Sequence, residues 1–368
     1  MWYNSDTKAY IFLSVFATTA TNVLGGCYRV FMHKQFTHIF HTIISLENLL
    51  EAWKEFVVGK HKRRDVQEFE RNLMANIILL HQELVAKTYV HLGYQQFKIT
   101  DPKLRDIHKA GVRDRLLHHA IYRKLYPFFE RVFIADSYSC RNNKGTHKAI
   151  RRFATFCHVV SKNNTKTVWV LKCDVKKFFA SIDQEILLKV LRMYISNEDI
   201  LWLLDRIISS FCSTRKGVGL PLGNLTSQLF ANVYLNELDQ FMKHKLKTKY
   251  YVRYADDFVI LSADKQVLYS MLLKINNFLQ EKLSLQLHPD KVFIKTLGSG
   301  VDFLGWVHFP DHRVLRTAAK RRMIQKLIAN PTDTILQSYL GLLQHGNTSK
   351  LRSIIIHEAE KNLVSSNI

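Results

Sequence analysis

The chain is 368 residues long and 47% hydrophobic, so it can bury a large core. Its 53 Lys and Arg residues exceed its 31 Asp and Glu residues, which gives a formal net charge of +22. Five cysteines without a C-x-x-C pair exclude an obvious zinc site or disulfide framework, and they indicate a reducing cytoplasm. The charge indicates a polyanionic partner. Nucleic acid is favoured over a membrane, and a generally basic protein is the alternative.

Residues 1–40 are predicted to be a non-essential N-terminal extension. Tyr10–Gly26 is apolar and rich in threonine, but it is too short and too polar for a transmembrane span. Asp6 weakens the positive start that a signal peptide needs, so a cleaved signal is the less favoured alternative. A translation start at Met32 would also account for the extension.

Residues 41–100 are predicted to be mainly helical. Leu46–Val57 has a helical pattern, and Asp65 with Glu68 three residues later resembles a capping box. Apolar residues then recur at steps of three and four, which predicts one amphipathic helix carrying Val66, Phe69, Leu73, Ile77, Leu80 and Leu84. Gly93–Thr100 is predicted to be a short strand region.

Helices and strands alternate in the middle of the chain. Asp106–Tyr126 is predicted to be a helix dense in basic residues. Val168–Asp174 reads as a buried strand that ends in an acid. Ile182–Ser210 and Leu225–Leu246 are predicted to be mainly helical, and a Gly/Pro loop at Gly217–Gly223 separates them.

The last part of the chain continues this mixture. Tyr250–Leu261 is apolar on both sides of an Asp-Asp pair, which predicts a hairpin with the acids at its turn. Val267–Leu283 is predicted to be a helix, and Lys291–Leu297 and Val301–His308 to be short strands. From Thr317 a basic, mainly helical tail follows. The interleaved strands and helices predict the α+β class.

Three acids carry the clearest chemical signal. Asp256 and Asp257 stand together beside apolar residues, where like charges repel and desolvation costs several kcal/mol. Asp174 ends a second apolar strand, so it could join them in holding two divalent ions about 3.5–4 Å apart. Such carboxylates suit Mg²⁺, with Mn²⁺ as a substitute, and the arrangement suits phosphoryl transfer. An ordinary hairpin turn is the alternative for the Asp pair.

Four segments resemble motifs of reverse transcriptases. Tyr254–Asp257 reads YADD and resembles the Y-x-D-D box, and Leu171–Phe179 resembles the box that carries the first catalytic Asp. Gly219–Gln228 resembles the nucleotide-pocket box, and Phe303–Trp306 resembles the primer grip. The match implies an RNA-directed DNA polymerase with two Mg²⁺ ions.

Two further segments resemble the fingers boxes of bacterial, group II-intron-like enzymes, namely Arg105–Arg115 and Ser137–Arg141. The resemblance implies a right-hand polymerase with fingers, a palm built on an antiparallel sheet, and a short thumb. Residues 41–100 would form an N-terminal helical region, 101–316 the fingers and palm, and 317–368 the basic helical thumb.

The resemblance also implies roles for individual residues. Asp174, Asp256, Asp257 and the backbone carbonyl of Val175 would be metal ligands, and Lys291 would protonate pyrophosphate, with a surface lysine as the alternative. The implied nucleotide-binding residues are Phe179, Leu222, Gly223, Gln228, Lys109, Arg113, Arg115 and Arg141. Phe179 would exclude the ribose 2′-hydroxyl, or would be an ordinary core aromatic. The implied primer and template contacts are Tyr254, Phe303, Leu304, Gly305, Trp306, Lys320, Arg321 and Arg322.

Two departures narrow the resemblance. Leu222 stands where most reverse transcriptases carry Gln, and Gln228 where they carry Pro. This form resembles the polymerases of diversity-generating retroelements, which copy a template RNA with frequent errors opposite adenine. Neutral packing of Leu222 is the alternative.

The same resemblance implies a set of partners: the template RNA, an RNA–DNA duplex, dNTPs and a small basic helical accessory protein. No membrane partner is expected. A group II intron-type or defence-associated reverse transcriptase, or a non-catalytic RNA-binding relative, remains an alternative.

Overall fold

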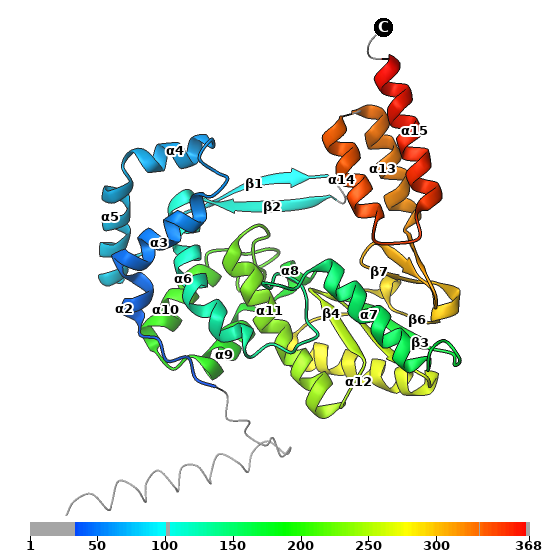
Figure 1. Ribbon diagram of the computed structural model, residues 1–368. Helices are drawn as coiled ribbons and strands as arrows, with labels where there is room; N and C mark the ends of the chain where they lie inside the picture. The colour runs from blue at the N-terminus through cyan, green and yellow to red at the C-terminus, as the bar shows by residue number, and fades with distance from the viewer. Residues whose placement is uncertain (1–33, 101–103, 331, 366–368) are drawn as a thin grey trace, which may run out of the picture. The chain divides into compact units, whose positions relative to one another are not determined.

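The computed structural model describes residues 34–100, 104–330 and 332–365 (Figure 1). Contacts divide the chain into two units, Met1–Lys34 and Gln35–Ile368, and the second unit contains all the described residues except Lys34. The predictions made for Tyr10–Gly26 and Met32 lie outside the described residues. No helix in the described part of the chain is long and apolar enough to cross a membrane.

The N-terminal part of this unit is a group of helices. They are α2 (Phe40–Ile44), α3 (Leu46–Val57), α4 (Arg64–Arg71), α5 (Leu73–Val85) and α6 (Val112–Glu130). The predicted helix at Leu46–Val57 is confirmed as α3. The prediction of one continuous helix after Asp65 is wrong, because the backbone breaks at Asn72 and α4 and α5 are separate.

The predicted capping box is also wrong. Arg63 caps α4 without a side-chain hydrogen bond, and Asp65 lies inside the first turn. Its carboxylate instead pairs with Lys109 and Arg115, each at 2.6 Å. Apolar spacing in α4 and α5 does predict the core, since Val66, Ile77, Leu80 and Leu84 are buried.

A two-stranded antiparallel hairpin lies between α5 and α6 in the chain. Its strands are β1 (Tyr94–Ile99) and β2 (Arg105–Ala110), with Tyr94 opposite Ala110. The predicted helix from Asp106 is therefore wrong over its first residues, and α6 begins only at Val112. Pairing with β1, and a bond from the His108 amide to the Leu222 carbonyl, override the local helical pattern.

The centre of the unit is a four-stranded antiparallel sheet in the order β4-β5-β3-β6. The strands are β3 (Trp169–Asp174), β4 (Tyr251–Tyr254), β5 (Asp257–Ser262) and β6 (Phe293–Thr296). The predicted strand ending in Asp174 and the predicted hairpin around the Asp-Asp pair are both confirmed.

Helices cover both faces of this sheet, and alternation along each strand explains why. Val170 packs with Phe153 of α7 (Thr146–Val160), whereas Leu171 belongs to the larger core that includes Leu235 and Ile275. Those two residues lie on α11 (Leu225–Gln240) and α12 (Lys265–Leu283). The period of two therefore fixes which side chains meet which helix.

Short elements complete this region (Figure 1). They are α8 (Phe178–Ser181), α9 (Gln184–Tyr194), α10 (Glu198–Ile208), the π-helix η1 (Phe241–Lys245), and the 3₁₀ turns η2 (Pro289–Lys291) and η3 (Leu297–Ser299). Asp183 caps α9 by accepting a hydrogen bond from the Ile186 amide.

The C-terminal part combines a small sheet with three helices. The sheet contains β7 (Val301–Phe303), β8 (Trp306–His308) and β9 (Arg313–Leu315), and the helices are α13 (Thr317–Ala329), α14 (Asp333–Leu343) and α15 (Ser349–Ser365). Met323, Leu343 and Ile355 share a small core of their own. The helical tail is confirmed, and the mixture of antiparallel sheets and helices confirms the α+β class.

Candidate active site

Three acids from two neighbouring strands lie at one end of the central sheet. Asp174 is the last residue of β3 and stands directly opposite Asp257, the first residue of β5. Tyr254 also pairs with Asp257, so Ala255 and Asp256 form the two-residue turn between β4 and β5. Because directly opposite residues in an antiparallel pair have Cβ atoms about 5 Å apart, the fold brings Asp174 and the YADD turn together.

Backbone hydrogen bonds hold this end of the sheet in place. The Val175 amide donates to the Asp256 carbonyl at 3.2 Å, which ties the chain after β3 to the turn. The His288 amide donates to the Asp174 carbonyl at 2.7 Å, and Lys176 donates to Gln286 at 2.8 Å. Hydrogen bonds therefore fix the backbone at Asp174 and at the two residues that follow it.

Two lysines offset the negative charge. Lys291 Nζ lies 2.8 Å from Asp174 Oδ1, and Lys172 Nζ lies 3.4 Å from Asp257 Oδ2. Burial raises the pKa of Asp257 to about 7, although Lys172 lowers it, and the charge of Asp174 raises it further. Burial and Asp174 likewise raise the pKa of Asp256. Burial and neighbouring negative charge therefore make the ionised forms of Asp256 and Asp257 energetically unfavourable.

The donor set fits a hard divalent cation. Asp257 Oδ1 is buried and has no hydrogen-bond partner, so one oxygen of the cluster is left unsatisfied. All three side chains offer the oxygen ligands that Mg²⁺ prefers. Among the described residues, no three acidic, histidine or cysteine side chains are gathered closely enough to hold an ion as they stand. The ion pairs with Lys172 and Lys291 occupy oxygens that a cation would need.

The predicted nucleotide-pocket box lies against the β1–β2 hairpin. The Leu222 carbonyl accepts from the His108 amide at 2.9 Å, and the Leu220 amide donates to the Phe179 carbonyl at 2.8 Å. Gly223 has a φ of +108°, and a Cβ there would lie 2.8 Å from Ile107. This turn therefore requires glycine, because a side chain would be strained and would collide with β2.

Three predicted nucleotide-binding side chains, Phe179, Leu222 and Gln228, are partly exposed. Phe179 packs against the main core, next to Phe178 at a ring separation of 5.4 Å. Leu222 is half-buried in the loop that precedes α11, and Gln228 is half-buried in the first turns of that helix.

The four predicted triphosphate cations are all engaged within the protein. Lys109 and Arg115 share Asp65. Arg113 pairs with Glu83 and donates to Asp114 at 3.2 Å. These three cations hold the hairpin and α6 to α4 and α5.

Arg141 is the most deeply held of the four. Its side chain is 3% exposed, and it donates to both carboxylate oxygens of Glu130 at 2.7 and 2.8 Å. A further bond reaches the Ser137 carbonyl. These bonds attach the segment that precedes α7 to Glu130, the last residue of α6.

The predicted primer-grip residues form the β7–β8 hairpin. Leu304 and Gly305 are its turn, with φ values of +52° and +86°. Phe303 and Trp306 are buried at 0% and 2% exposure, so their rings build a core under the turn. Tyr254 lies at the end of β4, and its hydroxyl accepts from Thr146 at 3.1 Å.

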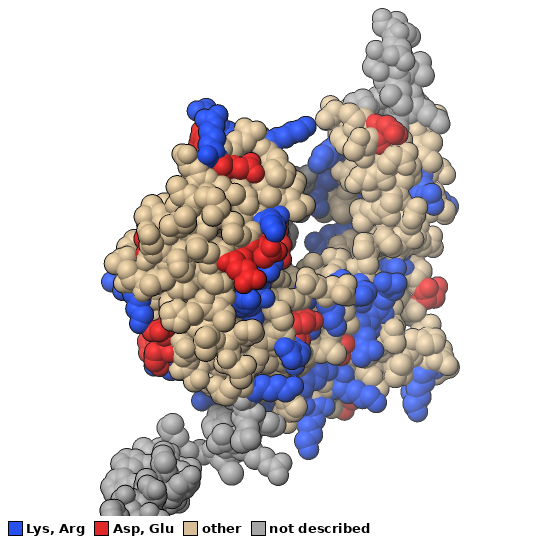
Figure 2. All heavy atoms as spheres, turned by 60° about the vertical axis from the view of Figure 1, so that its left-hand side comes forward, with Lys and Arg blue, Asp and Glu red and all other residues tan. Residues whose placement is uncertain are grey.

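The predicted thumb cations Lys320, Arg321 and Arg322 lie on α13 and are exposed. Figure 2 shows that Lys and Arg side chains are much more numerous than acidic ones over the lower right of that view. This distribution agrees with the net charge and with a polyanionic partner.

Two features of the site were not predicted from the sequence. Lys172 was not identified, although β3 pairs it with Val259, which lies two residues after Asp257 on β5. Asp239 was not identified either. It is fully buried in a pair with Arg253, whose position next to the YADD turn was the available signal.

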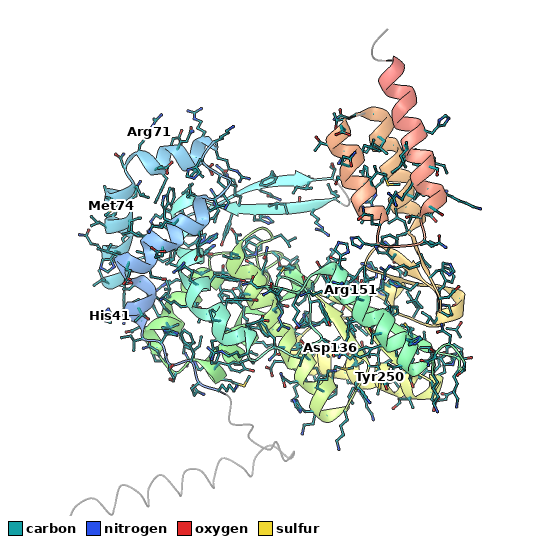
Figure 3. The ribbon with its side chains drawn as sticks, viewed as in Figure 1. His41, Arg71, Met74, Asp136, Arg151 and Tyr250 are labelled. Atoms are coloured by element: carbon teal, nitrogen blue, oxygen red, sulfur yellow. The ribbon has the colours of Figure 1, made fainter. Side chains whose placement is uncertain are left out.

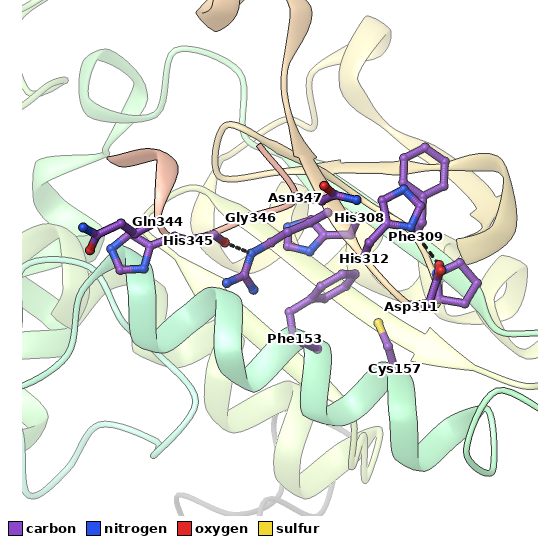
Figure 4. Close-up of a pocket in the computed structure, with 13 residues that line it drawn as sticks. Phe153, Cys157, His308, Phe309, Asp311, His312, Gln344, His345, Gly346 and Asn347 are labelled. Carbon is purple, nitrogen blue, oxygen red and sulfur yellow. Dashed lines mark hydrogen bonds and ion pairs between the residues drawn. The ribbon is translucent and has the colours of Figure 1, made fainter. Parts of the chain in front are cut away.

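A separate pocket of about 420 Å³ lies away from the three acids (Figure 4). Phe153 and Cys157 of α7 form part of its lining, together with the β8–β9 turn and the segment between α14 and α15. Arg313 donates to the His345 carbonyl across it, and Arg151 lies on the neighbouring α7 (Figure 3). No acid of the proposed active site lines this pocket.

Proteins of similar sequence include bacterial and intron-encoded proteins. The chain is 26% identical over 292 residues to protein YkfC of Escherichia coli (strain K12), covering 68% of this chain and 74% of YkfC. It is 22% identical over 292 residues to the group II intron-encoded protein LtrA of Lactococcus lactis subsp. cremoris. That match covers 61% of this chain, which spans only 47% of LtrA.

Two solved structures show a weaker, partial similarity. Apo telomerase from Candida tropicalis gives a TM-score of 0.46 at 14% identity, covering 66% of this chain and 60% of that one. Telomerase from Candida albicans gives 0.48 at 12% identity, covering 75% and 55%. Family membership therefore rests on the sequence. The match to the reverse transcriptase (RNA-dependent DNA polymerase) family extends over residues 98–308, more than half of the chain, and the protein belongs to that family.

Proposed function

We propose that this protein extends a primer on an RNA template, with Asp174, Asp256 and Asp257 holding two Mg²⁺ ions. The observation that carries the proposal is the register in which Asp174 stands opposite Asp257, beside the YADD turn. Bound ions would lower the pKa of the primer 3′-hydroxyl and neutralise the departing pyrophosphate. The Val175 carbonyl, directly after β3, is proposed as a further ligand, and Mn²⁺ as a substitute ion.

Lys291 is proposed to give a proton to the leaving pyrophosphate. Its ammonium group already lies 2.8 Å from Asp174 Oδ1, so it reaches the carboxylate cluster. Its side chain is 42% exposed, which leaves it accessible to a bound nucleotide. A lysine held at this point combines a positive charge with a transferable proton.

The nucleotide is proposed to lie between the YADD turn and the loop that carries Leu222 and Gly223. Phe179 would exclude a ribose 2′-hydroxyl, and Gln228 would face the same pocket from α11. Lys109 and Arg115 reach a phosphate only after release from Asp65, because that carboxylate now holds both. Arg113 and Arg141 are assigned the same role by their motif positions alone.

The remaining parts are assigned as a polymerase hand. The central sheet with α7, α11 and α12 would be the palm, the β1–β2 hairpin part of the fingers, and α13 to α15 the thumb. Lys320, Arg321 and Arg322 would then contact the backbone of an RNA–DNA duplex, and the β7–β8 turn with Tyr254 would support the primer. We place the protein in the cytoplasm, because the cysteines of the described residues are free thiols.

Within the family, we propose an error-prone enzyme of a diversity-generating retroelement. Leu222 carries the argument, because an alkyl side chain cannot make the hydrogen bonds of the Gln that most relatives have there. The template RNA and a small basic helical accessory protein would be its partners. A group II intron-type enzyme is the competing assignment, and the similarity to LtrA favours it.

The polymerase assignment is tested with purified protein, an oligo(dT) primer on poly(rA), dTTP and Mg²⁺. We expect extension by the wild type and none by Asp256→Ala, with both proteins binding the primer–template equally. An intact wild type that binds RNA without extending the primer would instead identify a non-catalytic RNA-binding relative.

The retroelement assignment is tested by sequencing cDNA made on a heteropolymeric RNA with all four dNTPs. An error rate opposite adenine well above that opposite the other three bases supports it. Equal error rates at all four bases would refute it and favour the intron-type or defence-associated alternative.

A further inference from the structure

Arg253 and Asp239 form a buried ion pair directly behind the YADD turn. Arg253 lies on β4 and is 1% exposed, while Asp239 lies on α11 and is 0% exposed. Arg253 Nε donates to Asp239 Oδ1 at 2.8 Å, and Nη2 donates to Oδ2 at 2.6 Å. This is the two-pronged geometry in which arginine binds a carboxylate most strongly.

Burial makes such a pair costly. Burial lowers the pKa of Arg253, but attraction and hydrogen bonding by Asp239 outweigh it and raise the pKa overall. Tyr251 adds a third bond by donating to Asp239 Oδ1 at 2.8 Å. A well-packed apolar pair of similar volume is often equally stable or more stable in such a position. Packing alone therefore does not explain why two charges are placed here.

The remaining donors of Arg253 reach toward the catalytic turn. Nη1 donates to the Ala255 carbonyl at 3.1 Å and to Asn232 Oδ1 at 3.2 Å. Ala255 is the residue before Asp256 and has a φ of +54°, in the left-handed region that a residue with a Cβ rarely adopts. A backbone conformation of this kind persists only where its surroundings enforce it.

Asp239 fixes the direction of the guanidinium, and α11 fixes Asp239. Asn232, on the same helix, holds the third side of the guanidinium and donates to the Ser139 carbonyl at 2.9 Å. The Arg253 backbone is held as well, because its amide donates to the Asp136 carbonyl at 3.0 Å. Hydrogen bonds thus hold both the backbone and the guanidinium group of Arg253, and the guanidinium donates to the turn at the Ala255 carbonyl.

We propose that Arg253 and Asp239 are positioning residues that hold the Ala255 peptide in its left-handed conformation and so set the orientation of the Asp256 and Asp257 carboxylates. The inference rests on the proposed function, since it assigns a role toward the same metal ligands. Without the clamp, the turn is expected to relax toward a right-handed or extended conformation at Ala255. The carboxylates of Asp256 and Asp257 would then spend less time in the orientation that binds the metal ions.

The test removes both charges together. Arg253→Met with Asp239→Leu replaces the pair by apolar side chains, because removing one partner alone leaves an uncompensated buried charge. The matched control is Arg123→Met with Glu55→Leu, which removes the ion pair between α6 and α3. Thermal unfolding, kcat, the KM for dTTP and the Mg²⁺ concentration for half-maximal rate are measured for each.

A second readout does not depend on DNA synthesis. With hydrogen peroxide and ascorbate added, Fe²⁺ bound in place of Mg²⁺ is oxidised by the peroxide and releases hydroxyl radicals that cut the polypeptide near its ligands, so the fragments map residues 174 and 256–257. We expect the Arg253/Asp239 double variant to melt close to the wild type, to lose these cuts, and to need a higher Mg²⁺ concentration. Its kcat should fall about 10- to 100-fold with little change in KM. The control pair should change none of these.

Wild-type kcat, Mg²⁺ dependence and cutting in a folded double variant would overturn the proposal. If the double variant does not fold, Arg253→Lys replaces it, because lysine keeps the charge but cannot bond both Asp239 and Ala255. The same losses are expected for Arg253→Lys, and wild-type behaviour would overturn the proposal there too. A wild type that is cut at these residues but makes no DNA would refute the polymerase function while still reporting on the clamp through the cuts.

Discussion

At the scale of single residues, function depends on where charge is placed in apolar surroundings. Asp257 Oδ1 is buried without a partner, and Lys172 and Lys291 only partly offset the acids around it. These costs are typical of a site that is completed by a cation. Glu237, by contrast, is a half-buried acid on α11 that lies outside the proposed chemistry, and its Oε1 is buried without a hydrogen-bond partner.

We predict that Glu237→Gln stabilises the protein above neutral pH. Burial first, and the charge of Asp239 second, raise the pKa of Glu237 to about 7, and its Oε1 has no partner. The folded state then holds a proton that the unfolded state releases near pH 4.5, so stability falls as pH rises from there to 7. The substitution should raise the unfolding free energy by roughly 1–3 kcal/mol at pH 8.

Urea unfolding at pH 5 and pH 8 measures this effect. The gain from Glu237→Gln should be large at pH 8 and small at pH 5, where the wild-type carboxyl is already neutral. A gain of the same size at both values would contradict the assigned ionisation.

Leu222→Gln is predicted to lower the error rate opposite adenine. Glutamine restores the amide that most reverse transcriptases carry at this position, and a lost or gained buried hydrogen bond is worth about 1–3 kcal/mol. The error frequency should therefore fall by about fivefold or more, while the backbone bond from the His108 amide to the carbonyl of residue 222 is kept. Deep sequencing of cDNA from one defined RNA gives the comparison.

The control for this experiment is Leu225→Gln, which places the same side chain nearby on α11, outside the two departures from the family pattern. An unchanged adenine error rate in Leu222→Gln, or an equal fall in Leu225→Gln, would show that residue 222 does not set fidelity.

At the scale of elements, ion pairs join segments that are far apart in the sequence. Asp65 on α4 holds Lys109 of β2 and Arg115 of α6 at 2.6 Å each. Burial alone would raise the pKa of Asp65, but the two cations lower it overall. This carboxylate therefore both attaches the hairpin and occupies two cations that a phosphate could use.

Asp65→Asn is predicted to release Lys109 and Arg115 for nucleic acid. Since the carboxylate is partly exposed, we expect a loss of stability of at most about 1 kcal/mol. Affinity for a primer–template should rise, measured by fluorescence anisotropy at fixed salt. Glu68→Gln, also on α4, is the matched control because Glu68 pairs with Arg64 on the same helix. Unchanged affinity in Asp65→Asn would argue against a phosphate-binding role for Lys109 and Arg115.

How far the sequence predicts each element depends on whether its pattern is local. β3 and the β4–β5 hairpin were predicted because apolar residues end at acids, and the structure confirms both. The helix expected from Asp106 fails because β2 is fixed by its pairing with β1 and by a bond from His108 to Leu222, neither of which a local pattern contains. The break at Asn72 was hidden because apolar residues keep the same spacing on both sides of it.

The same distinction applies to the site. The three acids were predicted from two short motifs, Leu171–Phe179 and Tyr254–Asp257, each of which is contained in a few consecutive residues. The partners of Arg141 and Arg253 could not be predicted in this way. Glu130 and Asp239 lie on other elements, and only the packing of those elements brings them to the arginines. Motif position identified Arg141, but only the three-dimensional contacts show that the side chains of Arg141 and Arg253 are both buried.

At the scale of the whole molecule, the charge of +22 should dominate nucleic-acid binding. Phosphate contacts release counterions, so the affinity for a duplex should fall steeply with salt. Lys320→Gln with Arg321→Gln removes two exposed cations of α13. The slope of log K against log [salt] is negative, and we predict that its magnitude falls by about 1.5–2 for an RNA–DNA duplex.

Lys189→Gln with Arg192→Gln provides the control, because both residues are exposed cations on α9 that pair with neighbouring acids. If the α13 variant keeps the wild-type slope, or if the α9 variant loses as much, the thumb does not contact the duplex as proposed.

The central claim is that Asp174, Asp256 and Asp257 jointly hold two divalent ions. The most direct measurement is the anomalous scattering of Mn²⁺ in crystals of the protein with an RNA–DNA primer–template and a non-hydrolysable dNTP analogue. The account predicts two peaks about 3.5–4 Å apart, bounded by the carboxylates of β3 and the YADD turn. Strong Mn²⁺ peaks elsewhere with none between these three carboxylates, in crystals where the nucleotide is bound, would contradict it.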